Sequence, residues 1–475
     1  MYTENEILFK TFKTFQHSYV YDRHTNALIM ITDEEYNELN MVQGEQLSPD
    51  QCTTIKKYQE LGMFQPNTLK HICHPSTSII EQHLRTRMKQ LTLQVTQQCN
   101  LRCKYCVYSG IYKGNRTHSN QRMSITTALK AIDFFLERNV EISDAVIGFY
   151  GGEPLLEIDL IKKCIEYARS RVEGRRILFN MTSNGTLLTD SIVDYLVDND
   201  IMLSISLDGS KAEHDLNRRF PDGSGSFDII ISNITRVRER YPEFFKRISI
   251  MTTINPHSDL GCVLEYFNSE DIFSDTSIMF NEMSKNSFEG DIISDDRAYA
   301  IRNYEYIKML FSLIGKFDPK YVSPLVLRSI RNAESKLKHI HNHTALQSVS
   351  HHGGPCIPGV RKLFVRVDGT LFPCERVNEE LDYFIIGTLE NGINIAKARK
   401  ILNNGELSES ECKSCWALRH CLVCSSQIES SDEPTRNNKL KICPNNENTV
   451  LFDLVELCVL REYGYENGNM ERLSL

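Results

Sequence analysis

The chain has 475 residues, of which 41% are hydrophobic and 24% are charged, as is typical of a soluble globular protein with about two or three domains. Its formal net charge of −8 argues against nucleic acid as a partner, because phosphate binding requires a basic surface. We find no apolar run long enough to span a membrane and no secretory signal, so we expect a cytoplasmic protein without a membrane partner. In that reducing compartment, fifteen cysteines indicate metal or redox chemistry rather than disulfides.

The first part of the chain, residues 1–66, predicts a small α+β module. The stretches SYVYD and NALIMI have the pattern of short strands, and the turn-forming stretch DRHTN lies between them. Thr32 and Glu35 form a capping-box pattern that would start a helix. Because so few elements bury little surface, we expect the module to dock on the rest of the chain or to bind a partner. Residues 67–87 are interpreted as a linker.

Residues 88–285 repeat a unit of strand, loop and helix about six times. The predicted strands are QLTLQVT, AVIGFY, ILFNM, IMLSIS, RISIMTTI and SIMF. Such a repeat predicts an α/β fold with a partial, TIM-like (β/α)6 barrel of parallel strands. The loops that follow the strands should converge, because chemistry in such barrels gathers at the carboxyl ends of the strands. Residues 286–345 are predicted to be a helical connector.

Cysteines form two groups in the sequence. Cys99, Cys103 and Cys106 directly follow the first predicted barrel strand. A structural zinc ribbon would explain the close pairs of the second group, but zinc sites use four or eight ligands and this group has seven cysteines. The second group consists of Cys356, Cys374, Cys412, Cys415, Cys421, Cys424 and Cys443.

The Cys-x3-Cys-x2-Cys spacing, with an aromatic residue before the last cysteine and GGEP after the second strand, resembles the radical S-adenosylmethionine (SAM) enzymes. The resemblance implies that Cys99, Cys103 and Cys106 hold a [4Fe–4S] cluster whose fourth iron binds SAM. The segment HDLNRRF resembles a family motif that places an arginine against the SAM carboxylate. The SAM contacts that the resemblance implies are Tyr105, Gly151, Gly152, Glu153, Ser183, Asn184, Ser206, Asp208 and Arg218.

Residues 346–450 resemble the SPASM extension of the same superfamily, and 451–475 would be a C-terminal helix and tail. The resemblance implies one auxiliary [4Fe–4S] cluster on Cys412, Cys415, Cys421 and Cys443, and a second, with an open iron, on Cys356, Cys374 and Cys424. The spacing between Cys421 and Cys424 is one residue shorter than the family pattern.

Three clusters in all are therefore expected. Some relatives close the open site with an additional cysteine, whereas this chain has SVSHHGG at that place. His351 or His352 could ligate the iron instead, but we expect a solvated loop.

The N-terminal module resembles the winged-helix-like peptide-recognition domain of maturases of ribosomally made peptides. Such domains take a leader peptide as an added strand on a sheet edge. The whole chain is most similar to thioether-forming maturases of the freyrasin and SCIFF types. The resemblance implies a deoxyadenosyl radical that removes a hydrogen from the precursor, and a substrate cysteine on the open auxiliary iron that forms the carbon–sulfur bond. The expected partners are a cysteine-rich precursor peptide and a reductant such as flavodoxin or ferredoxin.

Other functions remain open at this point. A SPASM enzyme could oxidise a side chain, as sulfatase maturases do, or join two carbons. Outside the enzymes, the chain could be an iron–sulfur electron carrier or a binding protein built on zinc. An electron carrier needs neither an open cluster site nor the GGEP and LDG loops at the strand ends.

Overall fold

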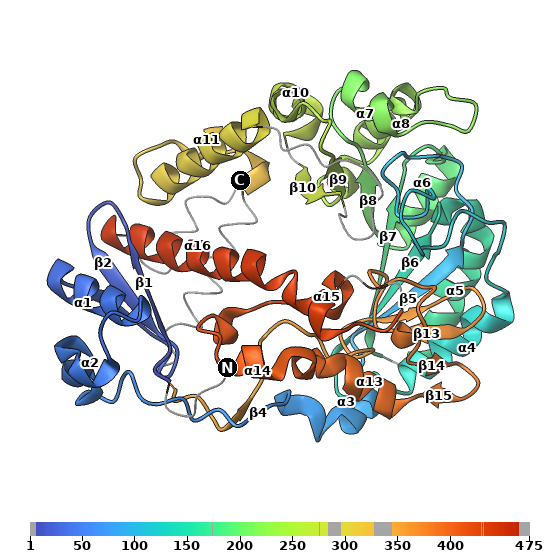
Figure 1. Cartoon of the computed structure of the whole chain (residues 1–475). Coiled ribbons are helices and arrows are strands. Elements are labelled where there is room, and N and C mark those ends of the chain that lie inside the picture. Colours follow the sequence, from blue (N-terminus) through green and yellow to red (C-terminus); the bar gives the residue numbers. More distant parts are fainter. Residues whose placement is uncertain are drawn as a thin grey trace.

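The computed structural model describes residues 6–172, 174–274, 276–283, 296–326, 344–428, 430 and 432–464. A ten-stranded sheet forms the main body, and its strand order is β10-β9-β8-β7-β6-β5-β12-β13-β14-β15. A separate three-stranded sheet lies near the N-terminus (Figure 1). Within the described residues, no helix is long and apolar enough to cross a membrane.

Six parallel strands form the barrel half of the large sheet. Helices cover the outer face of these strands, and β5 is buried along almost its whole length. The strands are β5 (Gln90–Thr96), β6 (Asp144–Gly151), β7 (Arg176–Ser183), β8 (Met202–Ser206), β9 (Ser249–Ile254) and β10 (Ser277–Glu282). The helices between them are α4 (Ile125–Leu136), α5 (Ile158–Arg171), α6 (Asp190–Asp198), α7 (Lys211–Asn217), α8 (Phe227–Arg240), α9 (Pro242–Phe245) and α10 (Leu260–Ser269). The predicted α/β fold with six parallel barrel strands is confirmed.

The large sheet continues from the barrel into the cysteine-rich C-terminal region. Strand β12 (Leu363–Val365) pairs in parallel with β5, with Leu363 opposite Leu91. The next three strands are antiparallel: β13 (Thr370–Phe372), β14 (Gly387–Thr388) and β15 (Gly392–Ile393). The sequence did not predict this continuation, because runs of two or three residues carry no usable periodicity.

The N-terminal module contains β1 (Phe9–Lys13), β2 (Ser18–Asp22) and β3 (Ala27–Ile31), followed by α1 (Asp33–Gln43) and α2 (Thr53–Gln59). Strand β1 was not among the two predicted strands. The predicted capping box at the start of α1 is present: the Thr32 side chain accepts from Glu35 N, and the Glu35 side chain accepts from Thr32 N.

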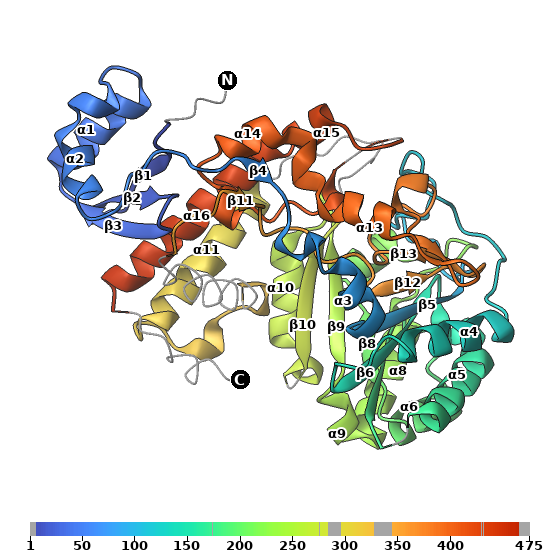
Figure 2. The ribbon, with the colours of Figure 1, turned by 90° about the horizontal axis from the view of Figure 1, so that it is seen from below.

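Both faces of this small sheet are covered. Apolar side chains of one face pack in a core with α1 and α2. On the other face, Phe12, Tyr19 and Tyr21 pack with residues of α11 (Asp296–Leu313) and α16 (Cys443–Glu462). Figure 2 shows the module beside the end of α16. The module is therefore docked on the body of the protein, which was one of the two alternatives expected from the sequence.

The segment predicted to be a linker is folded. It contains β4 (His71–Ile72), which pairs with β11 (Val349–Ser350), and α3 (Ile80–Thr86). The domain boundary predicted after residue 450 falls inside α16. The remaining helices of the C-terminal region are α13 (Ile395–Leu402), α14 (Glu409–Lys413) and α15 (Arg436–Leu440). Of the predicted connector, 286–295 and 327–343 lie outside the described residues.

Candidate functional site

The loop after β5 carries the first three cysteines. Its backbone amides point at the sulfurs: Leu101 N donates to Cys99 Sγ at 3.4 Å and Tyr108 N donates to Cys106 Sγ at 3.5 Å. Burial raises the pKa of the Cys99 thiol to about 11 and that of Cys103 to about 12. Without a bound cation these thiols would be neutral at pH 7, so the site becomes ligating only when metal ions displace the protons.

The spacing of these sulfurs suits a cluster rather than one ion. Within the described residues, no three His, Cys, Asp or Glu side chains converge on a position for a single metal ion. The three thiols nevertheless lie close together: besides burial, the charge of Cys106 raises the pKa values of Cys99 and Cys103, and that of Cys99 raises the pKa of Cys103. A cluster of several irons spreads its thiolate ligands further apart than a single ion does, and these residues fit such a group.

Two glycines bring the end of β6 against the cysteine loop. Gly151 has φ +143°, and a Cβ at this position would lie 2.0 Å from Thr96 O. A Cβ on Gly152 would lie 2.0 Å from Gln98 O. Gly152 N instead donates to Thr96 O at 3.0 Å. Any other residue would push the two strand ends apart, so the GG of GGEP has a steric reason.

Glu153 joins the ends of β6 and β7. It is 1% exposed, and burial raises its pKa. The carboxylate accepts from Ser183 Oγ at 2.8 Å, Asn184 N at 2.7 Å and Leu155 N at 3.1 Å. An ionised carboxylate offers about four acceptor positions, so one remains for a donor such as the ammonium group of SAM. The residue fits its predicted role and also has a structural one.

A buried ion pair organises the end of β8. Arg218 Nε donates to Asp208 Oδ2 at 2.8 Å, and Tyr105 OH donates to the same oxygen. The other oxygen, Asp208 Oδ1, accepts from Thr253 N at 2.9 Å. Asp208 therefore positions Arg218 rather than facing a ligand. Arg218 Nη1 reaches to 4.0 Å from Cys103 Sγ, which places its charge beside the cysteine loop.

The structure distinguishes between the two neighbouring arginines of the HDLNRRF segment. Arg218 is buried at the site, whereas Arg219 is exposed and donates to Gly223 O at 2.8 Å. His214, at the start of the motif, is also buried: its Nε2 bonds Ser226 Oγ at 2.9 Å, and its Nδ1 accepts from Asp208 N at 3.3 Å. The motif thus fixes the loop that carries Arg218.

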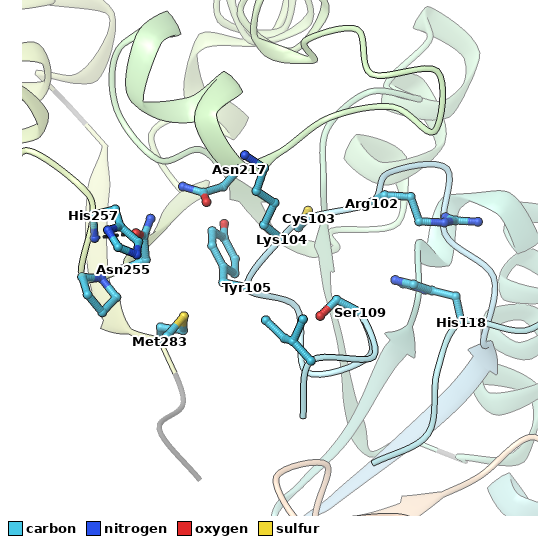
Figure 3. Close-up of a pocket in the computed structure, with 12 residues that line it drawn as sticks. Arg102, Cys103, Lys104, Tyr105, Ser109, His118, Asn217, Asn255, His257 and Met283 are labelled. Atoms are coloured by element: carbon cyan, nitrogen blue, oxygen red, sulfur yellow. Dashed lines mark hydrogen bonds between the residues drawn. The ribbon is translucent and has the colours of Figure 1, made fainter. Parts of the chain in front are cut away.

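Two cavities open beside the cysteine loop. The inner one, of about 180 Å³, is lined by the three cysteines and by every predicted SAM contact except Asp208. The outer one, of about 470 Å³, shares Cys103, Tyr105 and His118 with it (Figure 3). Further lining residues of the outer cavity are Arg102, Lys104, Asn217, Asn255, His257 and Met283. The inner cavity thus gathers the residues predicted to contact SAM, and the outer cavity adjoins it.

His118 is a candidate that sequence reasoning missed. Both ring nitrogens are buried without a hydrogen-bond partner in the described part of the chain, and the residue lines both cavities. Burial, with the charges of Arg102 and Arg116, lowers its pKa to about 4, so the imidazole is neutral at pH 7. A lone histidine in a loop carries no pattern that would distinguish it from a solvated residue.

The seven C-terminal cysteines separate into the two predicted sets. Burial, and to a lesser extent the charges of other thiols of the set Cys412, Cys415, Cys421 and Cys443, raise the pKa values of Cys415, Cys421 and Cys443. In the other set, burial and the charge of Cys424 raise the pKa of Cys374 to about 11. Arg361 interacts with all three members of that set and donates to Cys356 Sγ at 3.5 Å. Cys421 and Cys424 thus face different groups despite their short separation.

The expectation of a solvated loop at SVSHHGG was wrong for its two histidines. His351 and His352 are 8% and 1% exposed. His351 Nδ1 bonds His352 O at 2.8 Å, and its Nε2 accepts from Gly405 N at 3.0 Å. His352 Nε2 bonds Asn404 Oδ1 at 2.8 Å, and its Nδ1 accepts from Gly354 N at 3.3 Å. The two histidines can be buried because backbone and amide groups satisfy all four of their ring nitrogens, whereas Val349 and Gly353 on either side are exposed.

Residues 93–260 match the family model of the Radical SAM superfamily. This protein is a radical SAM enzyme. Its barrel cofactors are a [4Fe–4S] cluster and SAM, for which the cysteine loop and the inner cavity provide the residues.

Relatives of this radical SAM enzyme differ in how much of it they cover. An uncharacterized protein of Methanocaldococcus jannaschii is 36% identical over 139 residues, which are 29% of this chain and 45% of that protein. The cysteine-type anaerobic sulfatase-maturating enzyme of Clostridium novyi is 24% identical over 388 residues, or 77% of this chain and 93% of that enzyme. The radical SAM enzyme is thus related to the sulfatase-maturating enzymes over most of their length.

A solved structure shows the same fold. Native anSMEcpe with bound AdoMet has a TM-score of 0.55 and 20% sequence identity, covering 77% of this radical SAM enzyme and 99% of that chain. A further structure of that protein holds AdoMet together with the Kp18Cys peptide. About a quarter of the present chain therefore has no counterpart there.

Proposed function

We propose that this radical SAM enzyme is a peptide maturase that installs thioether crosslinks, from cysteine sulfur to carbon, in a ribosomally made cysteine-rich precursor. The observation that carries the proposal is the contact between the N-terminal module and the loop of the auxiliary cysteines. A peptide held by the module would be tethered to the region where its thiols are needed.

Two buried polar side chains make the first part of this contact. Arg23, 2% exposed, follows β2 and donates through Nη1 to Lys413 O at 2.5 Å. Asn67 donates through Nδ2 to the same carbonyl at 3.0 Å, and accepts from Arg23 Nη2. Lys413 stands between Cys412 and Cys415 in the sequence. The module is therefore bonded to the backbone of the auxiliary loop itself.

The β2–β3 turn makes the second part. Asn26 Oδ1 bonds His420 Nε2 at 2.8 Å and accepts from Tyr21 OH at 2.9 Å. The ring of Tyr21 packs edge-on against that of His420, with 5.3 Å between centroids. His420 directly precedes Cys421. Strand β3 is at an edge of its sheet, and Met30 on it is 58% exposed. A leader peptide that adds to this edge would rest on a module fixed to the cysteine loop.

The accessibility of the set Cys356, Cys374 and Cys424 supports delivery of a substrate thiolate to it. Cys356 is exposed, whereas Cys374 and Cys424 are partly buried, so the set is accessible from one side. The ring nitrogens of His351 and His352 are already bonded within the protein. An iron site with three protein ligands would bind a cysteine of the precursor as thiolate.

The residues of the barrel support the first half of the reaction. The remaining acceptor position on Glu153 and the buried charge of Arg218 suit the amino and carboxylate groups of SAM. When bound, SAM and the barrel cluster supply the radical that removes a hydrogen atom from the peptide. The outer cavity holds the peptide beside them. This arrangement favours an enzyme over an electron carrier or a zinc scaffold.

The second candidate is oxidation of a peptide side chain. It is favoured by the match over 93% of a cysteine-type sulfatase-maturating enzyme. Formation of a carbon–carbon crosslink is a third outcome of the same radical chemistry. Neither alternative requires a substrate thiolate on an open auxiliary iron.

Coexpression with the short cysteine-rich reading frame expected beside the gene tests the proposal. A thioether lowers the peptide mass by two hydrogens per bridge, blocks alkylation of that cysteine, and prevents fragmentation between the bridged residues in tandem mass spectrometry. Side-chain oxidation leaves the peptide linear, and a carbon–carbon link leaves the cysteines free to alkylate. Either result would replace thioether formation by the corresponding alternative.

A further inference from the structure

A buried lysine stands against one sulfur of the four-cysteine auxiliary set. Lys439, on α15, is 1% exposed, and its Nζ donates to Cys412 Sγ at 3.3 Å. In the described part of the chain, its ammonium group forms no ion pair with a carboxylate. A charged group this deeply buried requires a partner of opposite charge, and the cysteine sulfur is the group in position to provide it.

The fold fixes this contact from both sides. Helix α15 is capped by Thr435, whose side chain accepts from Asn438 N at 3.3 Å. Arg436 bonds Glu411 Oε1 at 3.0 Å, and Glu411 directly precedes Cys412. Cys443 Sγ bonds Lys439 O at 3.5 Å, so the lysine and a second cysteine of the set share one segment. These contacts hold the backbone of Lys439 beside the cysteines of the set.

A neutral thiol would be a poor partner for this ammonium group, because thiols accept hydrogen bonds only weakly. A thiolate bound to iron is negatively charged and accepts a charge-assisted hydrogen bond. The reduced form of a cluster carries one more negative charge than the oxidised form. A fixed positive charge beside a ligand therefore stabilises the reduced form and raises the reduction potential.

The cations beside the other two cysteine sets are weaker candidates for the same effect. The charge of Arg218, 4.0 Å from Cys103 Sγ, is shared with Asp208 in a buried pair. Arg361 is exposed, so water screens its charge at Cys356. Lys439 is buried and, among the residues that the structure describes, forms no such pair. Glu447 carries the opposite charge near the same four-cysteine set: its Oε1 lies 3.9 Å from Cys415 Sγ. This residue is partly exposed.

We propose that Lys439 is a positioning residue that holds the reduction potential of the cluster on Cys412, Cys415, Cys421 and Cys443 above that of the other auxiliary cluster. The more oxidising cluster would then accept the electron released when the product bond forms. The proposal rests on the assignment of a cluster to these four cysteines, and it does not depend on which bond the enzyme makes.

The experiment uses the full-length protein with Cys99, Cys103 and Cys106 changed to alanine, so that the barrel cluster does not contribute to the spectra. In this background we compare Lys439→Gln, which removes the charge, with Lys439→Arg, which keeps it. Lys441→Gln is the matched control, because Lys441 follows the same short helix and is exposed. Iron and sulfide are measured first, and then both auxiliary potentials by redox titration followed by EPR.

We expect Lys439→Gln to lower one of the two potentials, and Lys439→Arg and Lys441→Gln to leave both close to their original values. Unchanged potentials in Lys439→Gln, or an equal shift in Lys439→Arg, would overturn the proposal. Loss of one cluster in Lys439→Gln but not in Lys439→Arg would support a requirement for the charge. Loss in both would show that the residue serves packing only. If the background protein contains no iron for an auxiliary cluster, the assignment of clusters to these cysteines is refuted, whatever product the enzyme forms.

Discussion

The barrel site and the auxiliary region hold their cysteines in opposite ways. In the barrel, one short loop contains all three cysteines, and backbone amides and two glycines of the neighbouring strand shape it. In the auxiliary region, distant segments supply the cysteines, and side chains such as Arg23 and Lys439 hold those segments in place. The barrel site therefore depends on local backbone geometry, whereas the auxiliary region depends on tertiary contacts. Changes to single residues should therefore affect the two regions separately.

The largest effect is expected from changing Cys99, Cys103 and Cys106 together to alanine. Cleavage of SAM should stop, because the inner cavity loses the group that reduces SAM, while the auxiliary cysteines keep their own iron. Anaerobic iron and sulfide analysis should fall by about one cluster's share, and chromatography should detect no 5′-deoxyadenosine. Normal deoxyadenosine formation by the triple variant would refute the assignment of the barrel site.

Two glycine variants should each impair only one of the two regions. In Gly152→Ala the new methyl group would lie 2.0 Å from Gln98 O, and in Gly354→Ala it would lie 2.1 Å from Val423 O. Such overlaps cost about 1–3 kcal/mol and displace the backbone next to a cysteine set. We expect Gly152→Ala to lose barrel iron and SAM cleavage, and Gly354→Ala to lose auxiliary iron only. Gly353→Ala is the control, because its nearest neighbour would be at an ordinary 3.8 Å.

A change on the edge of β3 tests the N-terminal module without removing it. Deletion of the module would uncover the apolar residues of α11 and α16 on which it packs, so a point change is the cleaner test. We expect Met30→Asp to weaken precursor binding by about 1–2 kcal/mol, through lost apolar contact with the added strand, while SAM cleavage without peptide is unchanged. Fluorescence anisotropy with labelled precursor measures the affinity. Met41→Asp, on α1 and 44% exposed, should leave it unaltered; equal losses in both variants would contradict strand addition at β3.

The smallest effect concerns pH. Burial lowers the pKa of His214 to about 4, from 6.5 in the unfolded chain. The unfolded chain therefore binds a proton that the native protein excludes, and the free energy of unfolding should decrease as the pH falls from about 6.5 toward about 4. The full contribution is at most about 3 kcal/mol. Denaturant unfolding of His214→Asn at pH 7 and pH 5 should show a smaller loss between the two pH values than the unchanged protein. An equal loss would assign the pH dependence to other groups.

Much of the barrel site was predictable because its signals are local. The stretch QLTLQVT is β5 with the predicted bounds, and the loops after the strands converge on the inner cavity as expected. Asp208 is the exception: it follows a strand like its neighbours, but its side chain turns toward Arg218 and Tyr105. Side-chain direction at a strand end depends on which partners the fold brings near, and sequence does not contain that information.

The auxiliary region was less predictable for the same reason. Spacing separated the cysteines into two sets, but burial of His351 depends on Gly405, which is more than fifty residues away. His118 and Lys439 are single polar residues without periodicity, so their roles appear only when the cavities and the cysteine sulfurs are placed around them. Strand β1, with its lysines, lacks the strand pattern by which its two neighbours were predicted.

The pairing of β12 with β5 has a consequence for how the protein is made. Leu91 cannot meet its partner Leu363 until the ribosome has added the intervening residues, which takes roughly 15 to 50 seconds at ordinary elongation rates. Through that time one edge of the strand that leads into the cysteine loop stays unpaired and open to aggregation. Iron–sulfur assembly in the barrel should therefore follow synthesis of the C-terminal half, and chaperones that shelter exposed strand edges should increase the yield of loaded enzyme.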